Sequence, residues 1–108
     1  MDPHARLRDL GVDAATLCER WDALRAAAVG YRSSADLDHL RQLLEAQQDE
    51  LLRNRPVLGA TRWFVTEVIE IGDGYFAAIM DDGHIENCAI LRLEGEALTA
   101  VMESPTEG

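Results

Sequence analysis

Residues 61–80 read TRWFVTEVIEIGDGYFAAIM, and the predicted fold class follows from this stretch. It is rich in β-branched and aromatic residues, which favour extended strands over helices. The triplet GDG at 72–74 divides it, because glycine and aspartate accept the backbone angles of a tight turn. Two strands joined so closely must pair antiparallel. We therefore predict a hairpin with strands at about 61–71 and 75–80.

The same pattern continues toward the carboxyl end of the chain. Two further runs of strand-forming residues, at about 85–93 and 96–102, are separated by the turn-forming groups DDGH at 81–84 and EG at 94–95. Short connections between successive strands predict that each pairs with the next, which gives a four-stranded antiparallel β-meander. The final residues, 103–108, are expected to fray.

The first half of the chain has helical periodicity. A helix is predicted at about 13–29, with Asp13 as its cap and apolar residues spaced by three and four positions at Leu17, Trp21 and Leu24. A second is predicted at about 35–54, where leucines form one stripe and Pro56 ends the helix. A brief helical turn over 3–10 precedes them. The short link predicts an antiparallel pair of helices.

Together these elements predict a single α+β domain over 1–108, in which an N-terminal antiparallel helical hairpin packs on a four-stranded antiparallel β-meander. A chain of 108 residues is long enough for one modest core. Its apolar stretches are too short to cross a bilayer, and its start lacks the apolar region of a secretory signal. A cytoplasmic location is therefore expected. All ten basic residues are Arg, which with many Ala suggests a GC-rich bacterial or phage genome.

The formal net charge is −10, and it is unevenly distributed. Residues 1–56 hold ten acidic residues and eight Arg, whereas residues 57–108 hold ten acidic residues and two Arg. An acidic surface repels nucleic acid phosphates and anionic membranes, because binding to both depends on basic side chains. The charge therefore predicts no direct nucleic acid or membrane partner, and it favours another protein with a basic surface.

Neither face of the predicted sheet is fully polar. On the first strand Trp63, Val65, Ile69 and Ile71 alternate onto one face, which Glu67 interrupts. If the helices cover one face, the other keeps a partly apolar surface with an acidic rim, and such surfaces usually mediate contacts with a partner or a second copy. The residues predicted to bind a partner are Phe64, Glu67, Val68, Glu70, Tyr75, Asp81, Asp82, Glu86 and Ile90, with Phe64 and Tyr75 as anchors.

The nonapeptide MDDGHIENC at 80–88 gathers chemically active side chains. Asp82-Gly83 between two apolar runs predicts a two-residue type I′ hairpin turn, which would place Asp81 opposite His84. A metal site would need Asp81, His84 and Glu86 to converge, with Cys88 on the same face. Alternate residues of a strand lie about 6.6 Å apart, which is too far for one ion to hold them without a bulge. We predict no metal, cofactor or catalytic residue here.

Cys18 and Cys88 are 70 positions apart and form no CxxC pair. In a reducing compartment they are expected to be small buried apolar residues. A disulfide or a shared metal is the alternative that the spacing leaves open.

These features favour a small acidic, non-enzymatic protein-binding module that docks on a basic surface of its partner as an inhibitor or regulator. Immunity proteins, antitoxins, anti-defence inhibitors and anti-activators share this profile as a class. One alternative is a small ligand-binding or enzymatic domain with a pocket between helices and sheet around Glu67, which interrupts an apolar face. The other is a dimeric structural subunit joined through the outer sheet face.

Overall fold

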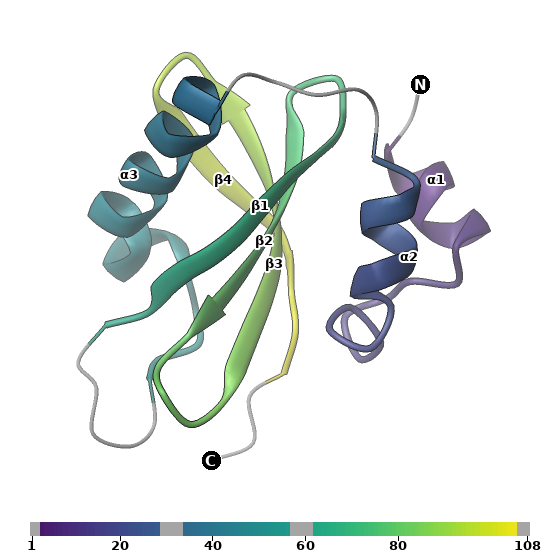
Figure 1. The fold of residues 1–108 in the computed structure, drawn as a ribbon, viewed down its shortest axis with the longest axis horizontal. Helices are drawn as coiled ribbons and strands as arrows, with labels where there is room; N and C mark the ends of the chain where they lie inside the picture. Colours follow the sequence, from purple (N-terminus) through teal and green to yellow (C-terminus); the bar gives the residue numbers. More distant parts are fainter. Residues whose placement is uncertain (1–2, 29–33, 57–61, 106–108) are drawn as a thin grey trace.

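The computed structural model describes residues 3–28, 34–56 and 62–105. An antiparallel sheet forms its centre, with strands β1 (Phe64–Gly72), β2 (Tyr75–Asp81), β3 (Glu86–Glu94) and β4 (Ala97–Glu103). The spatial order is β1-β2-β3-β4, so each strand pairs with its neighbour in sequence (Figure 1). The predicted four-stranded meander is confirmed, whereas residues 57–61 and 106–108, including the predicted start of the first strand, lie outside the described residues.

The turn between β1 and β2 depends on its glycines. Gly72, Asp73 and Gly74 all have positive φ, at 120°, 52° and 80°. L-residues with a side chain rarely adopt this region, and aspartate is among the exceptions. A Cβ on Gly74 would also lie 3.3 Å from the carbonyl oxygen of Leu93. The GDG triplet therefore serves backbone geometry and no ligand needs to be invoked for it.

The sheet is covered on both faces by helices. The long helix α3 (Ser34–Leu51) lies on one side, and the short helices α1 (Pro3–Asp9) and α2 (Trp21–Ala26) lie on the other (Figure 1). Two apolar clusters result. The α3 cluster includes Leu40, Leu44, Trp63, Val65, Val68, Phe76 and Leu91. The N-terminal cluster includes Leu7, Leu17, Trp21, Leu24, Ile71, Ala77 and Ile90.

The predicted helical hairpin on a single face is therefore wrong. In the described residues only one helix is long, and the stretch predicted as a helix over 13–29 consists of turns at 14–20 followed by the six-residue α2. Its last residue and the link up to residue 33 lie outside the described residues. The physical reason is the sheet, whose strands carry apolar side chains on both faces, so that each face needs its own cover.

The N-terminal segment is shaped by local hydrogen bonds. After α1, the N–H of Gly11 donates to the carbonyl of Arg8 (3.0 Å) and that of Val12 to the carbonyl of Leu7 (2.8 Å), with Gly11 at a φ of 70°. This is the Schellman arrangement that ends many helices. Asp13 and Thr16 then accept each other's backbone N–H groups, at 2.9 and 3.0 Å. The predicted cap at Asp13 thus exists, although it begins a turn.

A bulge in β1 redistributes its side chains between the two faces. Val65 pairs with Met80 and Glu67 pairs with Ile79, which leaves Thr66 as the extra residue. Its hydroxyl donates to the carbonyl of Ile79 at 3.1 Å. Because the extra residue shifts the alternation by one, Val65 faces α3 whereas Glu67 and the residues after it change sides.

Candidate functional site

Three of the residues predicted to bind a partner lie together at one end of the sheet. In the strand register Phe64 lies opposite Asp81, and Asp81 lies opposite Glu86, so these three side chains form one row across β1, β2 and β3. Directly paired residues project to the same face. We refer to Phe64, Asp81 and Glu86 as the Phe64 row.

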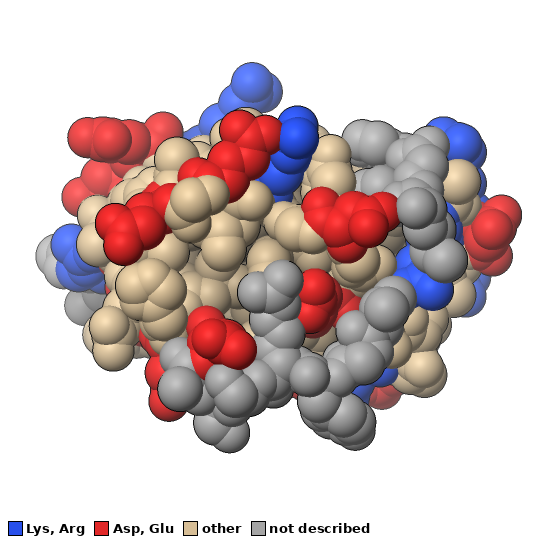
Figure 2. Space-filling model, turned by 90° about the horizontal axis from the view of Figure 1, so that it is seen from above, with Lys and Arg blue, Asp and Glu red and all other residues tan. Residues whose placement is uncertain are grey.

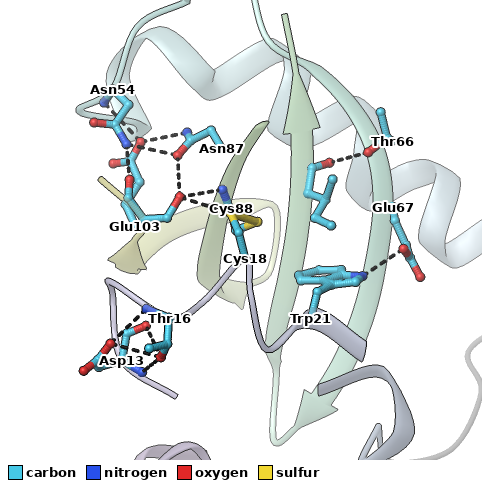
Figure 3. Close-up of a disulfide and its surroundings, with 12 residues drawn as sticks. Asp13, Thr16, Cys18, Trp21, Asn54, Thr66, Glu67, Asn87, Cys88 and Glu103 are labelled. Atoms are coloured by element: carbon cyan, nitrogen blue, oxygen red, sulfur yellow. Dashed lines mark hydrogen bonds between the residues drawn. A yellow bond between two sulfur atoms is a disulfide. The ribbon is translucent and has the colours of Figure 1, made fainter. Parts of the chain in front are cut away.

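The Phe64 row lies just beyond the part of the sheet that the N-terminal segment covers. The preceding row on this face consists of Glu67, Ile79 and Cys88, which Trp21 and Cys18 contact (Figure 3). Phe64 is 61% exposed, and it is the exposed large apolar side chain within the described ranges. Glu86 is exposed and Asp81 is half-buried. An aromatic ring therefore stands beside two carboxylates on an open sheet face.

The two carboxylates of the row have an electrostatic cost. Asp81 and Glu86 are direct cross-strand partners, and like charges in such a pair repel each other. One oxygen of Asp81, Oδ1, accepts the backbone N–H of Gly83. A guanidinium or ammonium group placed against both carboxylates would relieve the repulsion, and a planar guanidinium would also stack on the Phe64 ring.

Glu67, the predicted centre of a pocket, is committed to contacts within the chain. Its carboxylate accepts hydrogen bonds from Arg25 Nε (2.6 Å) and Nη2 (2.7 Å) and from Trp21 Nε1 (2.8 Å). The Arg25 hydrogen bonds hold the pKa of Glu67 below its usual value, and the Trp21 hydrogen bond acts in the same direction. Asp22 contacts the same guanidinium at 2.8 Å. Glu67 therefore ties α2 to β1.

The other predicted partner residues lie apart from the Phe64 row. Val68 and Ile90 are buried in the α3 and N-terminal clusters, respectively. Glu70 and Tyr75 lie at the opposite end of the strands, where the Arg92 guanidinium stands 5.7 Å from the centre of the Tyr75 ring. The same Arg92 pairs with Glu94 at 2.7 Å. Arg92 thus contacts both an aromatic ring, that of Tyr75, and a carboxylate, that of Glu94.

The MDDGHIENC segment forms a longer turn than predicted. Because Asp81 pairs with Glu86, the connection contains four residues and His84 lies within it, exposed. Asp82 is 5% exposed, and its Oδ1 accepts the N–H groups of His84 (2.8 Å) and Ile85 (2.9 Å). The carboxylate and a backbone hydrogen bond from the N–H of Asp82 to the carbonyl of Ile85 (3.3 Å) together hold this longer turn. No group of three or more metal-binding side chains is found in the described part of the chain.

The two cysteines form a disulfide. Cys18 in the N-terminal turns and Cys88 in β3 are bonded, with their Cα atoms 5.7 Å apart (Figure 3). The expectation of two free buried thiols is therefore wrong, and the alternative that the spacing left open holds. Disulfides persist in oxidising compartments and are rare in the cytosol. The disulfide therefore does not favour the cytoplasmic location, which stays a prediction. Within the described residues no helix has the length and apolar character required to span a bilayer.

A buried polar cluster that was not predicted from the sequence lies beside the disulfide (Figure 3). Asn87 is fully buried; its amide nitrogen donates to Glu103 (3.0 Å) and its oxygen accepts from Asn54 (3.0 Å) and Ser104 (3.3 Å). The one signal was an asparagine within an apolar strand, where this residue type is rare. Ser104 donates to an amide oxygen, which is not a base, so the cluster does not activate a serine nucleophile.

A groove among the described residues lies at the β4 edge of the sheet, whereas the pocket predicted around Glu67 would lie at the β1 edge. This groove of about 850 Å³ runs along β4 between the end of α3 and residues Ala14 and Ala15. Glu67 is on β1, which forms the other edge of the sheet, and it does not line this groove. Its lining is mixed, with apolar side chains beside polar ones and the charged residues Glu50, Arg53 and Glu103.

Acidic side chains form several groups on the molecular face viewed in Figure 2. This agrees with the formal net charge of −10.

Comparisons with protein-family models, with curated proteins and with solved structures find no match for this chain.

Proposed function

We propose that this protein is a non-enzymatic protein-binding module that docks the Phe64 row on a basic surface of a partner protein and thereby inhibits or regulates it. The observation that carries the proposal is the exposure of Phe64 in register with Asp81 and Glu86. Binding energy at interfaces concentrates in aromatic residues that become buried on association. Carboxylates around such a residue select a basic partner and accelerate the encounter.

The chemistry of the row favours an arginine-bearing partner over a second copy. Two copies meeting through this face would bring four carboxylates together, and like charges at an interface are costly. An arginine would pair with Asp81 and Glu86 while its planar group lay against Phe64. The contacts of Arg92 with Tyr75 and Glu94 show the same combination inside this chain.

The experiment is a quantitative pull-down from a lysate of the source cells with wild type and two single variants, Phe64→Ala and Glu86→Arg. Glu96→Arg in the β3–β4 turn serves as the matched control, since it makes the same charge change on an exposed residue outside the row. A basic protein that wild type and the control recover, and that both row variants lose, is the expected result. Its recovery should fall between about 50 and about 300 mM salt.

Equal recovery of the partner by wild type, Phe64→Ala and Glu86→Arg would contradict the proposal. Light scattering of the purified protein tests the alternative of a dimeric subunit. A dimer that dissociates in the Phe64→Ala variant would show that the row joins two copies.

A further inference from the structure

The outer edge of β4 lies along the groove of about 850 Å³ described above. β4 is the last strand of the sheet order, so one side of its backbone faces away from β3. Free strand edges offer N–H and C=O groups to which an extended chain can add as a further strand. The volume lies within the range of ligand-binding pockets.

A side chain of α3 occupies the beginning of this edge. The amide nitrogen of Gln47 donates to the carbonyl of Glu96 at 2.9 Å, and its oxygen accepts the N–H of Leu98 at 3.3 Å. One amide group thus fills the positions that a peptide group of an added strand would take. It also shows that Leu98 directs its N–H outward from the sheet.

The next outward position is Ala100, because outward and inward backbone groups alternate along an antiparallel strand. The regular alternation ends there, since Ala100 lies opposite Leu91 and Met102 opposite Ile90, which leaves Val101 as an extra residue. In the described part of the chain no side-chain hydrogen bond reaches Thr99, Ala100 or Val101. The groove around them has a mixed lining, with apolar side chains such as Leu51 and Met102 beside polar ones such as Asn54. The outward backbone groups of Ala100 therefore face a groove that offers both apolar and polar contacts.

The shape and charge of the groove identify its occupant. The end of α3 borders β4 on one face, and Ala14 and Ala15 border it on the other. A second copy would bring its own acidic side chains to the same edge, where like charges repel. Glu50 and Glu103 also line the groove, against Arg53 alone, in a chain of net charge −10.

We propose that the β4 groove binds an extended, uncharged or basic segment of another polypeptide, which adds to the sheet as a fifth strand by pairing with the edge around Ala100. This site is separate from the Phe64 row, which begins at the opposite edge of the sheet. A negative result at one site therefore leaves the proposal for the other site unaffected.

The test is an NMR titration of the isotope-labelled protein with the capped peptide Ac-KTVTVTK-NH2. Main-chain pairing tolerates many sequences, so this peptide should shift the amide signals of Leu98 to Met102. The same peptide with proline at the central position lacks an N–H and should bind about fivefold more weakly, the effect of about one hydrogen bond. A peptide with glutamate in place of both lysines should also bind more weakly.

Two protein variants complete the test. Gln47→Ala exposes the backbone groups of Glu96 and Leu98 and should bind the lysine peptide about threefold more tightly. Gln42→Ala, on the exposed side of α3, is the matched control and should leave the affinity unchanged. Ala100→Pro removes the outward N–H and should abolish binding; its thermal unfolding shows whether it is folded.

The proposal is overturned if the lysine peptide at millimolar concentration leaves the amide signals of Leu98 to Met102 in place. It is also overturned if Gln47→Ala and Gln42→Ala bind the peptide equally. A dimer of the protein that Ala100→Pro dissociates would make a second copy the occupant, and would likewise overturn it.

Discussion

At the residue scale, Thr66 determines which apolar side chains of β1 share a core. Strict alternation places Val65, Ile69 and Ile71 on one face, but the extra residue at the bulge sends Val65 to the α3 cluster and Ile71 to the N-terminal cluster. Bulges leave little trace in the hydrophobic pattern, because both faces of this strand are partly apolar. The one-residue shift in the pairing of β1 with β2 is therefore visible only in the structure.

Glu67 should stabilise the folded protein in a way that depends on pH. Its pKa is lowered in the folded protein, chiefly by hydrogen bonds from Arg25. The resulting stabilisation is fully present above the pKa of Glu67 in the unfolded chain and is lost as pH falls through its lowered pKa in the folded protein. Glu67→Gln should lower Tm by a few degrees at neutral pH, and by progressively less as the solution is acidified into that range.

Thermal unfolding followed by circular dichroism between neutral and acidic pH measures this difference. Glu96→Gln is the control, because Glu96 is exposed and its variant should unfold like wild type at each pH. An unchanged Tm for Glu67→Gln at neutral pH would mean that the contacts to Arg25 and Trp21 do not stabilise the protein.

At the element scale, helices and strands differed in how far the sequence predicted them. The four strands follow from β-branched runs and turn residues, and both signals are local. The helix predicted over 13–29 rested on the spacing of Leu17, Trp21 and Leu24, which do face one cluster. Hydrogen-bonded turns keep these residues on that side while bringing Cys18 to β3. Periodicity shows which side chains are buried, but it does not fix the backbone that carries them.

The disulfide should be a major source of stability for this arrangement. It closes a chain segment of 70 residues, and by the chain-entropy model such a crosslink stabilises the folded state by about 4 kcal/mol. Reduction by a dithiol should lower the free energy of unfolding in urea by about that amount. A Cys18→Ser/Cys88→Ser variant should be insensitive to the dithiol.

The number of reactive thiols is measured in the same samples as the urea unfolding, to show whether the disulfide is intact. The oxidised protein, denatured without reductant, should release no reactive thiol, and the reduced protein should release both. Equal stability of the oxidised and reduced forms would show that the crosslink does not hold the N-terminal segment to the sheet.

At the scale of the whole molecule, charge acts on stability as well as on binding. A net charge of −10 on a chain of 108 residues makes the folded state repel itself, and added salt screens this repulsion. We expect Tm to rise between about 20 and about 200 mM sodium chloride. Calorimetry at constant pH measures it. A fall in Tm would indicate that attractive pairs such as Arg25 with Glu67 outweigh the overall repulsion.

The sequence by itself determined the α+β class, the order of the strands, the turn at Gly72 to Gly74 and the acidic character of the chain. These depend on local backbone preferences and on composition. Of the residues predicted to bind a partner, Phe64, Asp81 and Glu86 lie in one row, whereas others such as Val68 and Ile90 are buried. The candidate site could therefore be predicted only in part.

Only the tertiary structure decided that helices cover both faces of the sheet, that Cys18 meets Cys88, and that Glu67 is held by Arg25. Each of these joins residues that are far apart in the chain. Which distant pairs meet is set by the packing of whole elements and by a one-residue shift at Thr66, and neither can be read from a local pattern.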